Sequence, residues 1–181
     1  MNLRFIFVFV ITASLSLLAA ASGLPPWQLG MTKSQVASFK EFGPYRSFPN
    51  GDLETYNGRF HGRKTNIQFF FQGDRLRRIA VYLYEGTDPK GGIPALRLAY
   101  DALEKDYGNV KVPEMGVGSG SDPLNSEVIA IGAAANADVT GETHLIPAEQ
   151  PADMRVLARI FTGIVQGKKW YYVIVSYDPN A

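Results

Sequence analysis

Cysteine is absent from all 181 residues of the chain. The absence excludes disulfides, a thiol nucleophile and a lipid attached to cysteine behind an apolar leader. An exported protein of this composition must therefore hold its fold without covalent cross-links. The roughly 160 residues that remain after removal of a leader are enough for such a core.

The chain also has almost no net charge and only two histidines. Lys and Arg total 18 against 17 Asp and Glu, and loss of Arg4 with a leader makes the two numbers equal. This balance argues against a general nucleic-acid binder. Only His61 and His144 are present, without the short spacing of a zinc helix. We expect no cofactor and interpret His61 as an exposed polar residue; a site shared by both histidines is the alternative.

Signatures of known catalytic and phosphate sites are missing too. There is no G-x-S-x-G elbow. The stretch "GVGSGS" lacks the GK[ST] ending of a phosphate loop, so we predict a flexible loop over 111–122.

The first residues have the order of an export signal. Arg4 precedes the apolar run "FIFVFVITASLSLL", and three alanines follow, ending at Ala21. This order predicts a signal peptide over 1–21, cleaved after Ala21, with an uncleaved anchor as the alternative. We expect one exported domain over 22–181, in the periplasm or secreted.

The first part of that domain predicts a short helix and a strand meander. Thr32 and Gln35 have the spacing of a capping box at the start of a helix within 29–39, and Gly43 ends the helical segment. Three strands are predicted over 53–60, 65–71 and 76–84. "QGD" over 72–74 is the expected turn between the last two.

The second part begins with the clearest helix, which has Pro94 in its first turn and Gly108 at its end. Its apolar stripe consists of Leu96, Ala99, Tyr100, Leu103 and Tyr107. A further helix is predicted to be capped by Asp122, with Pro123 in its first turn. Its expected buried face consists of Leu124, Val128, Ile131 and Ala135. A buried strand over 128–131 is the alternative.

The last segment predicts an extended stretch over 143–151 and then a hairpin. Its strands are expected over 154–165 and 170–177, with a turn over 166–169. The string "QGKKWYYVIV" from Gln166 follows the pattern of "QGDRLRRIAV" from Gln72. We interpret this as two tandem α-then-β halves over 25–88 and 92–181, although hairpins in general share the pattern. The fold class is α+β, with helices packed on one face of an antiparallel sheet.

"LGMTKSQV" followed by a strand meander resembles the SmpA/OmlA (BamE-like) family of outer-membrane-assembly lipoproteins. The doubled plan resembles the β-lactamase-inhibitor-like fold. The resemblance implies a periplasmic or secreted module that binds protein without a catalytic centre. The chain departs from the lipoprotein pattern because no cysteine follows the leader.

Aromatic residues on the predicted strands are the best candidates for a binding surface, because Tyr and Trp are favoured where surfaces are buried on binding. With one arginine, the predicted set is Phe70, Tyr82, Tyr84, Trp170, Tyr172 and Arg78. Burial of these aromatics in the core is the alternative. Two basic clusters, Arg59/Arg63/Lys64 and Arg75/Arg77/Arg78, suit an acidic partner or a solvated sheet rim.

We therefore expect a non-enzymatic binding or accessory module of the cell envelope that recognises a protein or an envelope polymer. The alternative is a small carboxylate-based hydrolase or sugar-acting enzyme. A glycosidase needs two carboxylates about 5–9.5 Å apart in a cleft. The nearest sequence pairs are Asp52/Glu54, Asp101/Glu104 and Glu104/Asp106.

Overall fold

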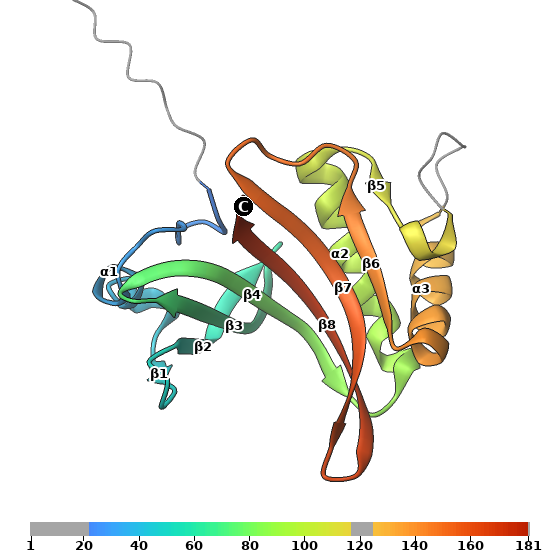
Figure 1. Cartoon of the computed structure of the whole chain (residues 1–181), viewed down its shortest axis with the longest axis horizontal. Helices are drawn as coiled ribbons and strands as arrows, with labels where there is room; N and C mark the ends of the chain where they lie inside the picture. The colour runs from blue at the N-terminus through green and yellow to red at the C-terminus, as the bar shows by residue number, and fades with distance from the viewer. Residues whose placement is uncertain (1–21, 117–124, 181) are drawn as a thin grey trace, which may run out of the picture.

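The computed structural model describes residues 22–116 and 125–180. The predicted signal peptide and the 117–122 part of the predicted flexible loop lie outside them. Eight strands form one antiparallel sheet in the order β1-β2-β3-β4-β8-β7-β6-β5 (Figure 1). No helix within the described ranges is long and apolar enough to cross a membrane.

The strands are β1 (Tyr45–Ser47), β2 (Leu53–Phe60), β3 (Arg63–Gln72), β4 (Arg75–Gly86), β5 (Val110–Lys111), β6 (Glu142–Pro147), β7 (Met154–Val165) and β8 (Lys168–Pro179). The helices are α1 (Lys33–Ala37), α2 (Ile93–Tyr107) and α3 (Ser126–Thr140), with 3-10 turns η1 (Lys40–Phe42), η2 (Pro89–Gly92) and η3 (Pro113–Met115). All three predicted strands of the first half and the hairpin of the second are confirmed.

The N-terminal segment covers one face of β2–β4. The capping box is present: Gln35 N donates to Thr32 Oγ1 at 3.2 Å, and Thr32 N donates to Gln35 Oε1 at 2.8 Å. The box fixes the start of α1, which buries Val36. Trp27 packs on Phe69 of β3 with ring centroids 5.0 Å apart. The first half therefore has its own helical cover on the sheet.

The helix α2 follows its predicted stripe. Leu96, Ala99 and Leu103 are fully buried, because their spacing places them on one side of the helix. Gly108 ends the helix with φ 77°, a conformation that glycine adopts without steric cost.

The helix α3 corrects part of the prediction. The segment is helical, so the strand alternative over 128–131 is wrong, and Asn125 caps it by accepting from Glu127 N at 2.8 Å. Val128 and Ile131 are 57% and 49% exposed, so the expected buried face is wrong as well. The buried side consists of Ile129, Ala130, Ala133, Ala134 and Ala137. Small alanines allow a close approach to the neighbouring elements, and this outweighs the larger apolar surface of the other side. The predicted positions Asp122, Pro123 and Leu124 lie outside the described residues.

The second hairpin turns more tightly than predicted. Gln166 and Gly167 form the two-residue turn with φ 51° and 76°, as tight hairpin turns require. β8 therefore begins at Lys168, which pairs with Val165, and the expected turn over 166–169 is too long.

The final strands of the two halves meet at the centre of the sheet. Val81 of β4 lies opposite Val175 of β8, and these two residues occupy equivalent positions in the repeated pattern. The neighbouring pairs, Ala80 with Ser176 and Tyr82 with Ile174, are also related by exchange of the halves. Two equivalent strands facing each other across a two-fold axis have this register. A common origin of the halves stays a prediction.

The helices of both halves cover the same face of the sheet. One continuous cluster of buried residues joins Trp27 and Val36 in the first half to Leu96, Ala133 and Val173 in the second. In Figure 1, α2 and α3 lie on one side of β6–β8, and none of the described helices lies on the other. The predicted fold class, α+β with helices on one face of an antiparallel sheet, is confirmed.

Candidate binding face

We call the side of the sheet opposite the helices the open face. Strand alternation divides the "WYY" string between the two sides. Tyr171 and Val173 are buried against the helices, whereas Trp170 and Tyr172 point to the open face and are half-buried. The alternative, burial in the core, is therefore wrong for Trp170 and Tyr172.

Three aromatic rings form a stack on this face. Phe161 of β7 lies directly opposite Tyr172 of β8, and their ring centroids are 5.1 Å apart at an interplanar angle of 18°. Trp170 continues the stack at 6.4 Å and 24°. The residue opposite Trp170 is Gly163, which has no side chain to compete for the space. Offset stacking of this kind fixes the orientation of the rings before any ligand binds.

A chain of charged groups extends the stack toward the sheet edge. The Arg159 guanidinium lies over the Phe161 ring at 4.5 Å, and its Nη1 donates to Glu142 Oε1 at 3.0 Å. Arg159 is held on both sides, by the ring and by the carboxylate, so it is a fixed cation on the open face.

His144 closes this chain on β6, the strand next to the edge strand β5. Its Nε2 lies 3.3 Å from Glu142 Oε1, and its Nδ1 lies 2.6 Å from Glu114 Oε1. Burial raises the pKa of Glu114. Hydrogen bonds from the His144 ring and from backbone amides together lower the pKa by more than burial raises it, so the pKa lies below its usual value. The complete row, which we call the aromatic–ionic row, is Trp170, Tyr172, Phe161, Arg159, Glu142, His144 and Glu114.

Tyr82 lies on β4 beside this row. Burial, and then the charge of Glu85, raise the pKa of its hydroxyl, which keeps the group neutral. Ile174, opposite Tyr82, is only 3% exposed although no helix in the described part of the chain covers this face. The surrounding side chains therefore exclude water from the centre of the open face.

Tyr84 does not belong to the open face, which corrects its place in the predicted set. A bulge at Leu83 shifts the register, so that Tyr84 lies opposite the buried Val173 on the helix side. Its hydroxyl donates to the Asp88 carbonyl at 2.6 Å. Simple alternation would have put Tyr82 and Tyr84 on one face. The extra residue at the bulge turns the Tyr84 side chain to the helix side instead.

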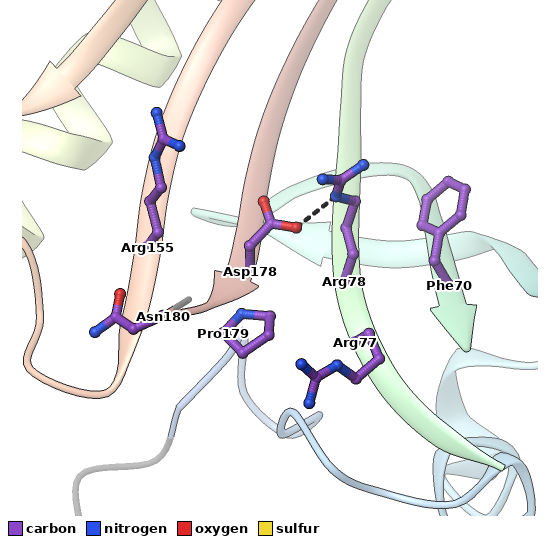
Figure 2. Close-up of a pocket in the computed structure, with 7 residues that line it drawn as sticks. All are labelled: Phe70, Arg77, Arg78, Arg155, Asp178, Pro179 and Asn180. Atoms are coloured by element: carbon purple, nitrogen blue, oxygen red, sulfur yellow. Dashed lines mark hydrogen bonds and ion pairs between the residues drawn. The ribbon is translucent and has the colours of Figure 1, made fainter. Parts of the chain in front are cut away.

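Phe70 and Arg78 lie on the open face at the other end of β8. Together they line a shallow depression of about 490 Å³ whose other lining residues are Arg77, Arg155, Asp178, Pro179 and Asn180 (Figure 2). Asp178 is six residues beyond Tyr172, which is about 20 Å along an extended strand. The five predicted site residues that lie on the open face therefore divide into two separate places.

The carboxylates proposed for hydrolysis are mostly engaged elsewhere. Asp52 accepts from Phe71 N at 2.8 Å and from Asn50 Nδ2 at 2.7 Å, so it stabilises the backbone. Asp101 and Glu104 on α2 face water. Glu54 lies near Glu85, whose pKa is raised by burial and then by the charge of Glu54.

The two histidines do not share a site, so that alternative is wrong. His61 is exposed, as expected, and pairs with Asp106 of α2 at 2.9 Å on the helix side of the sheet. His144 pairs with its own carboxylates on the open face. Within residues 22–116 and 125–180, no three His, Asp or Glu side chains are grouped so as to hold a metal ion.

Sequence reasoning missed the contribution of β7. Arg155, Arg159 and Phe161 are alternate residues of this strand, and all face the open side. Period-two alternation over 154–165 contained this signal. The overlong turn concealed it, because a turn over 166–169 places Gly163 instead of Phe161 opposite Tyr172.

Comparison of the chain with models of protein families, with curated proteins and with solved structures gave no match in any of the three. The resemblance to outer-membrane-assembly lipoproteins and to the β-lactamase-inhibitor-like fold stays a prediction.

Proposed function

We propose that the protein is an exported, non-enzymatic binding or accessory module of the cell envelope, which recognises a protein or an envelope component through the open face. One observation carries the proposal. Three stacked aromatic rings, half-exposed and held on regular strands, stand on a sheet face that none of the helices within residues 22–116 and 125–180 covers.

Rigid aromatic side chains are effective binding anchors because little conformational entropy is lost when a partner covers them. Trp170 and Tyr172 are already fixed by stacking, and Arg159 is fixed by Phe161 and Glu142. A face that served only as a solvated surface would need no such order. The open face therefore fits a partner that covers the aromatic rings and also pairs with the charged groups beside them.

Export is supported by the leader alone. The charged residue, the apolar run and the alanines up to Ala21 are the basis for placing the protein in the periplasm or outside the cell.

Site-specific photo-crosslinking in intact cells tests the proposal. A benzoylphenylalanine replaces Tyr172 on the open face, and the matched control replaces Val139, which is 86% exposed on α3. We expect the same partner adduct from position 172 and from position 170, and none from position 139. Co-expression of the unlabelled protein should compete the adduct away, and co-expression of the Trp170→Ala variant should not. Equal labelling at all three positions, or no adduct at 170 and 172, would refute the binding face.

A carboxylate-based hydrolase is the second candidate, and one observation favours it. Glu85 has a raised pKa beside Glu54, as a general acid requires when it stands next to a charged carboxylate. A glycosidase and esterase screen of the purified protein tests it. Activity that disappears in Glu85→Gln while crosslinking at position 172 persists would establish this candidate.

A further inference from the structure

Three arginines meet at one corner of the open face, although the sequence separates them widely. Arg77 and Arg78 are consecutive on β4, where a register shift against β3 breaks the alternation, and both line the depression. Arg155 comes from β7, on the other side of β8. Figure 2 shows these guanidinium groups around Asp178 and Pro179, with Phe70 at the border.

The corner has an excess of positive charge. Arg78 Nε donates to Asp178 Oδ1 at 2.5 Å, so this pair is nearly neutral. Among the residues that the structure describes, the side chains of Arg77 and Arg155 have no hydrogen-bond or ion-pair partner. Two guanidinium groups are therefore available to an incoming anion.

We propose that this arginine corner, defined by Arg77, Arg78 and Arg155, binds the carboxylates of an acidic peptide segment. The inference rests on the proposed function and specifies the chemistry of its partner. Guanidinium groups match carboxylates with paired N–H donors, which gives direction as well as attraction.

The walls of the depression select for a peptide. Phe70 and Pro179 contribute apolar surface to it. Phe70 also borders a second depression, of about 370 Å³, whose lining includes Phe48 and Pro49. A peptide segment can occupy both depressions if an acidic residue pairs with the arginines in the first and an apolar residue packs beyond Phe70 in the second. A fully hydrophilic polymer would leave the apolar surface of Phe48, Pro49 and Phe70 uncovered.

The charges around the corner argue against a long polyanion. Asp178 stands inside the corner, and Glu54 and Glu85 occupy the same face of the sheet away from it. A polymer with a negative charge on every unit would meet these carboxylates as it crossed the face. A short acidic segment avoids them.

Fluorescence anisotropy with three probes tests the inference. The first is a labelled peptide with glutamates on both sides of a phenylalanine, the second is its glutamine counterpart, and the third is labelled polyphosphate. We expect saturable binding of the acidic peptide and at least about tenfold weaker binding of the glutamine peptide and of polyphosphate.

The variant Arg77→Gln/Arg155→Gln locates the site without leaving Asp178 unpaired. We expect it to weaken the acidic peptide by about tenfold or more. The control Arg63→Gln/Lys64→Gln removes the same charge from exposed positions at the start of β3 and should change binding by less than about twofold. Circular dichroism of both variants checks their fold.

Failure of the wild-type protein to bind the acidic peptide would overturn the inference, and so would tighter binding of polyphosphate or equal loss in both double variants. Crosslinking at position 172 separates this failure from failure of the binding face. Adducts that persist without peptide binding refute the arginine corner alone, whereas loss of the adducts refutes the proposed function.

Discussion

The two faces of the sheet use the same strands for different purposes. On the helix side of β8, Val173 and Val175 are completely buried in the common core. On the open side of the same strand, Trp170 and Tyr172 are half-buried and stack in a row that ends in fixed charges. Consecutive residues of β8 thus serve different purposes: Val173 belongs to the core and Tyr172 belongs to the surface.

The difference shows how one element can carry stability and recognition separately. The helix side is apolar and buried, so its residues contribute through burial and packing. The open side holds rings and ion pairs whose order does not come from helix packing. Changes on the two sides should therefore have different consequences, and the following variants test this from the largest expected effect to the smallest.

Neighbouring residues of β7 give the strongest contrast. Ile160 is fully buried on the helix side, so Ile160→Ala should lower the free energy of unfolding by about 2–5 kcal/mol. The adduct yield at position 172, measured per folded molecule, should not change. Urea denaturation followed by circular dichroism measures the loss. A cost below about 1 kcal/mol would show that this face is not a tightly packed core.

The position of Tyr84 can be tested through a glycine beneath it. A Cβ on Gly91 would lie 2.5 Å from the Tyr84 hydroxyl oxygen, so Gly91→Ala should destabilise the protein by about 1–3 kcal/mol through overpacking. Truncation of the ring should relieve this clash, so the double variant Gly91→Ala/Tyr84→Ala should lose less stability than the sum of the two single variants. Additive effects of the two changes would show that Tyr84 lies elsewhere.

On the open side, Tyr172→Ala removes the middle ring of the stack. We expect a loss of about 1 kcal/mol in stability, since an aromatic pair contributes about 0.5–1.5 kcal/mol, but a loss of about tenfold or more in the partner adduct formed from position 170. The matched control is Tyr84→Phe, which keeps the ring and should leave the adduct unchanged. If the variant loses stability but keeps its adduct, the aromatic–ionic row contributes to the fold and not to binding.

Alkaline titration distinguishes the tyrosines of the two sides. Burial, and then the charges of Asp106 and Asp153, raise the pKa of Tyr107 to about 12. A tyrosine in the unfolded chain titrates near 10. Because the folded state holds this proton more tightly, the contribution of Tyr107 to stability is complete below about pH 10 and is lost as pH rises toward 12.

Tyr107→Phe should therefore flatten the fall in stability between about pH 10 and 12, as measured by urea denaturation at several pH values. Part of the slope should remain, since burial also raises the pKa of Tyr177. Tyr82→Phe is the open-side control and should flatten the slope less, because Arg159 and Arg78 oppose the effect of burial on its pKa. An equal effect of both variants would contradict the contrast between the faces.

Local patterns predicted the elements correctly wherever neighbouring residues decide the outcome. The capping box at Thr32, the apolar stripe of α2 with its stop at Gly108, and the strand pairs around the glycine turns all follow from short-range spacing. The same patterns selected Phe70, Tyr82, Trp170, Tyr172 and Arg78 as surface candidates, and all five lie on the open face.

The tertiary structure decided what depends on register and on competition between surfaces. The bulge at Leu83 moved Tyr84 to the helix side, and the two-residue turn placed Phe161 opposite Tyr172. α3 buried its alanines in place of Val128 and Ile131. Only chain pairing across β8 brought Arg155 to Arg77 and Arg78. Spacing along a chain fixes which residues share a side of one element, whereas their partners on other strands depend on registers that the whole sheet sets together.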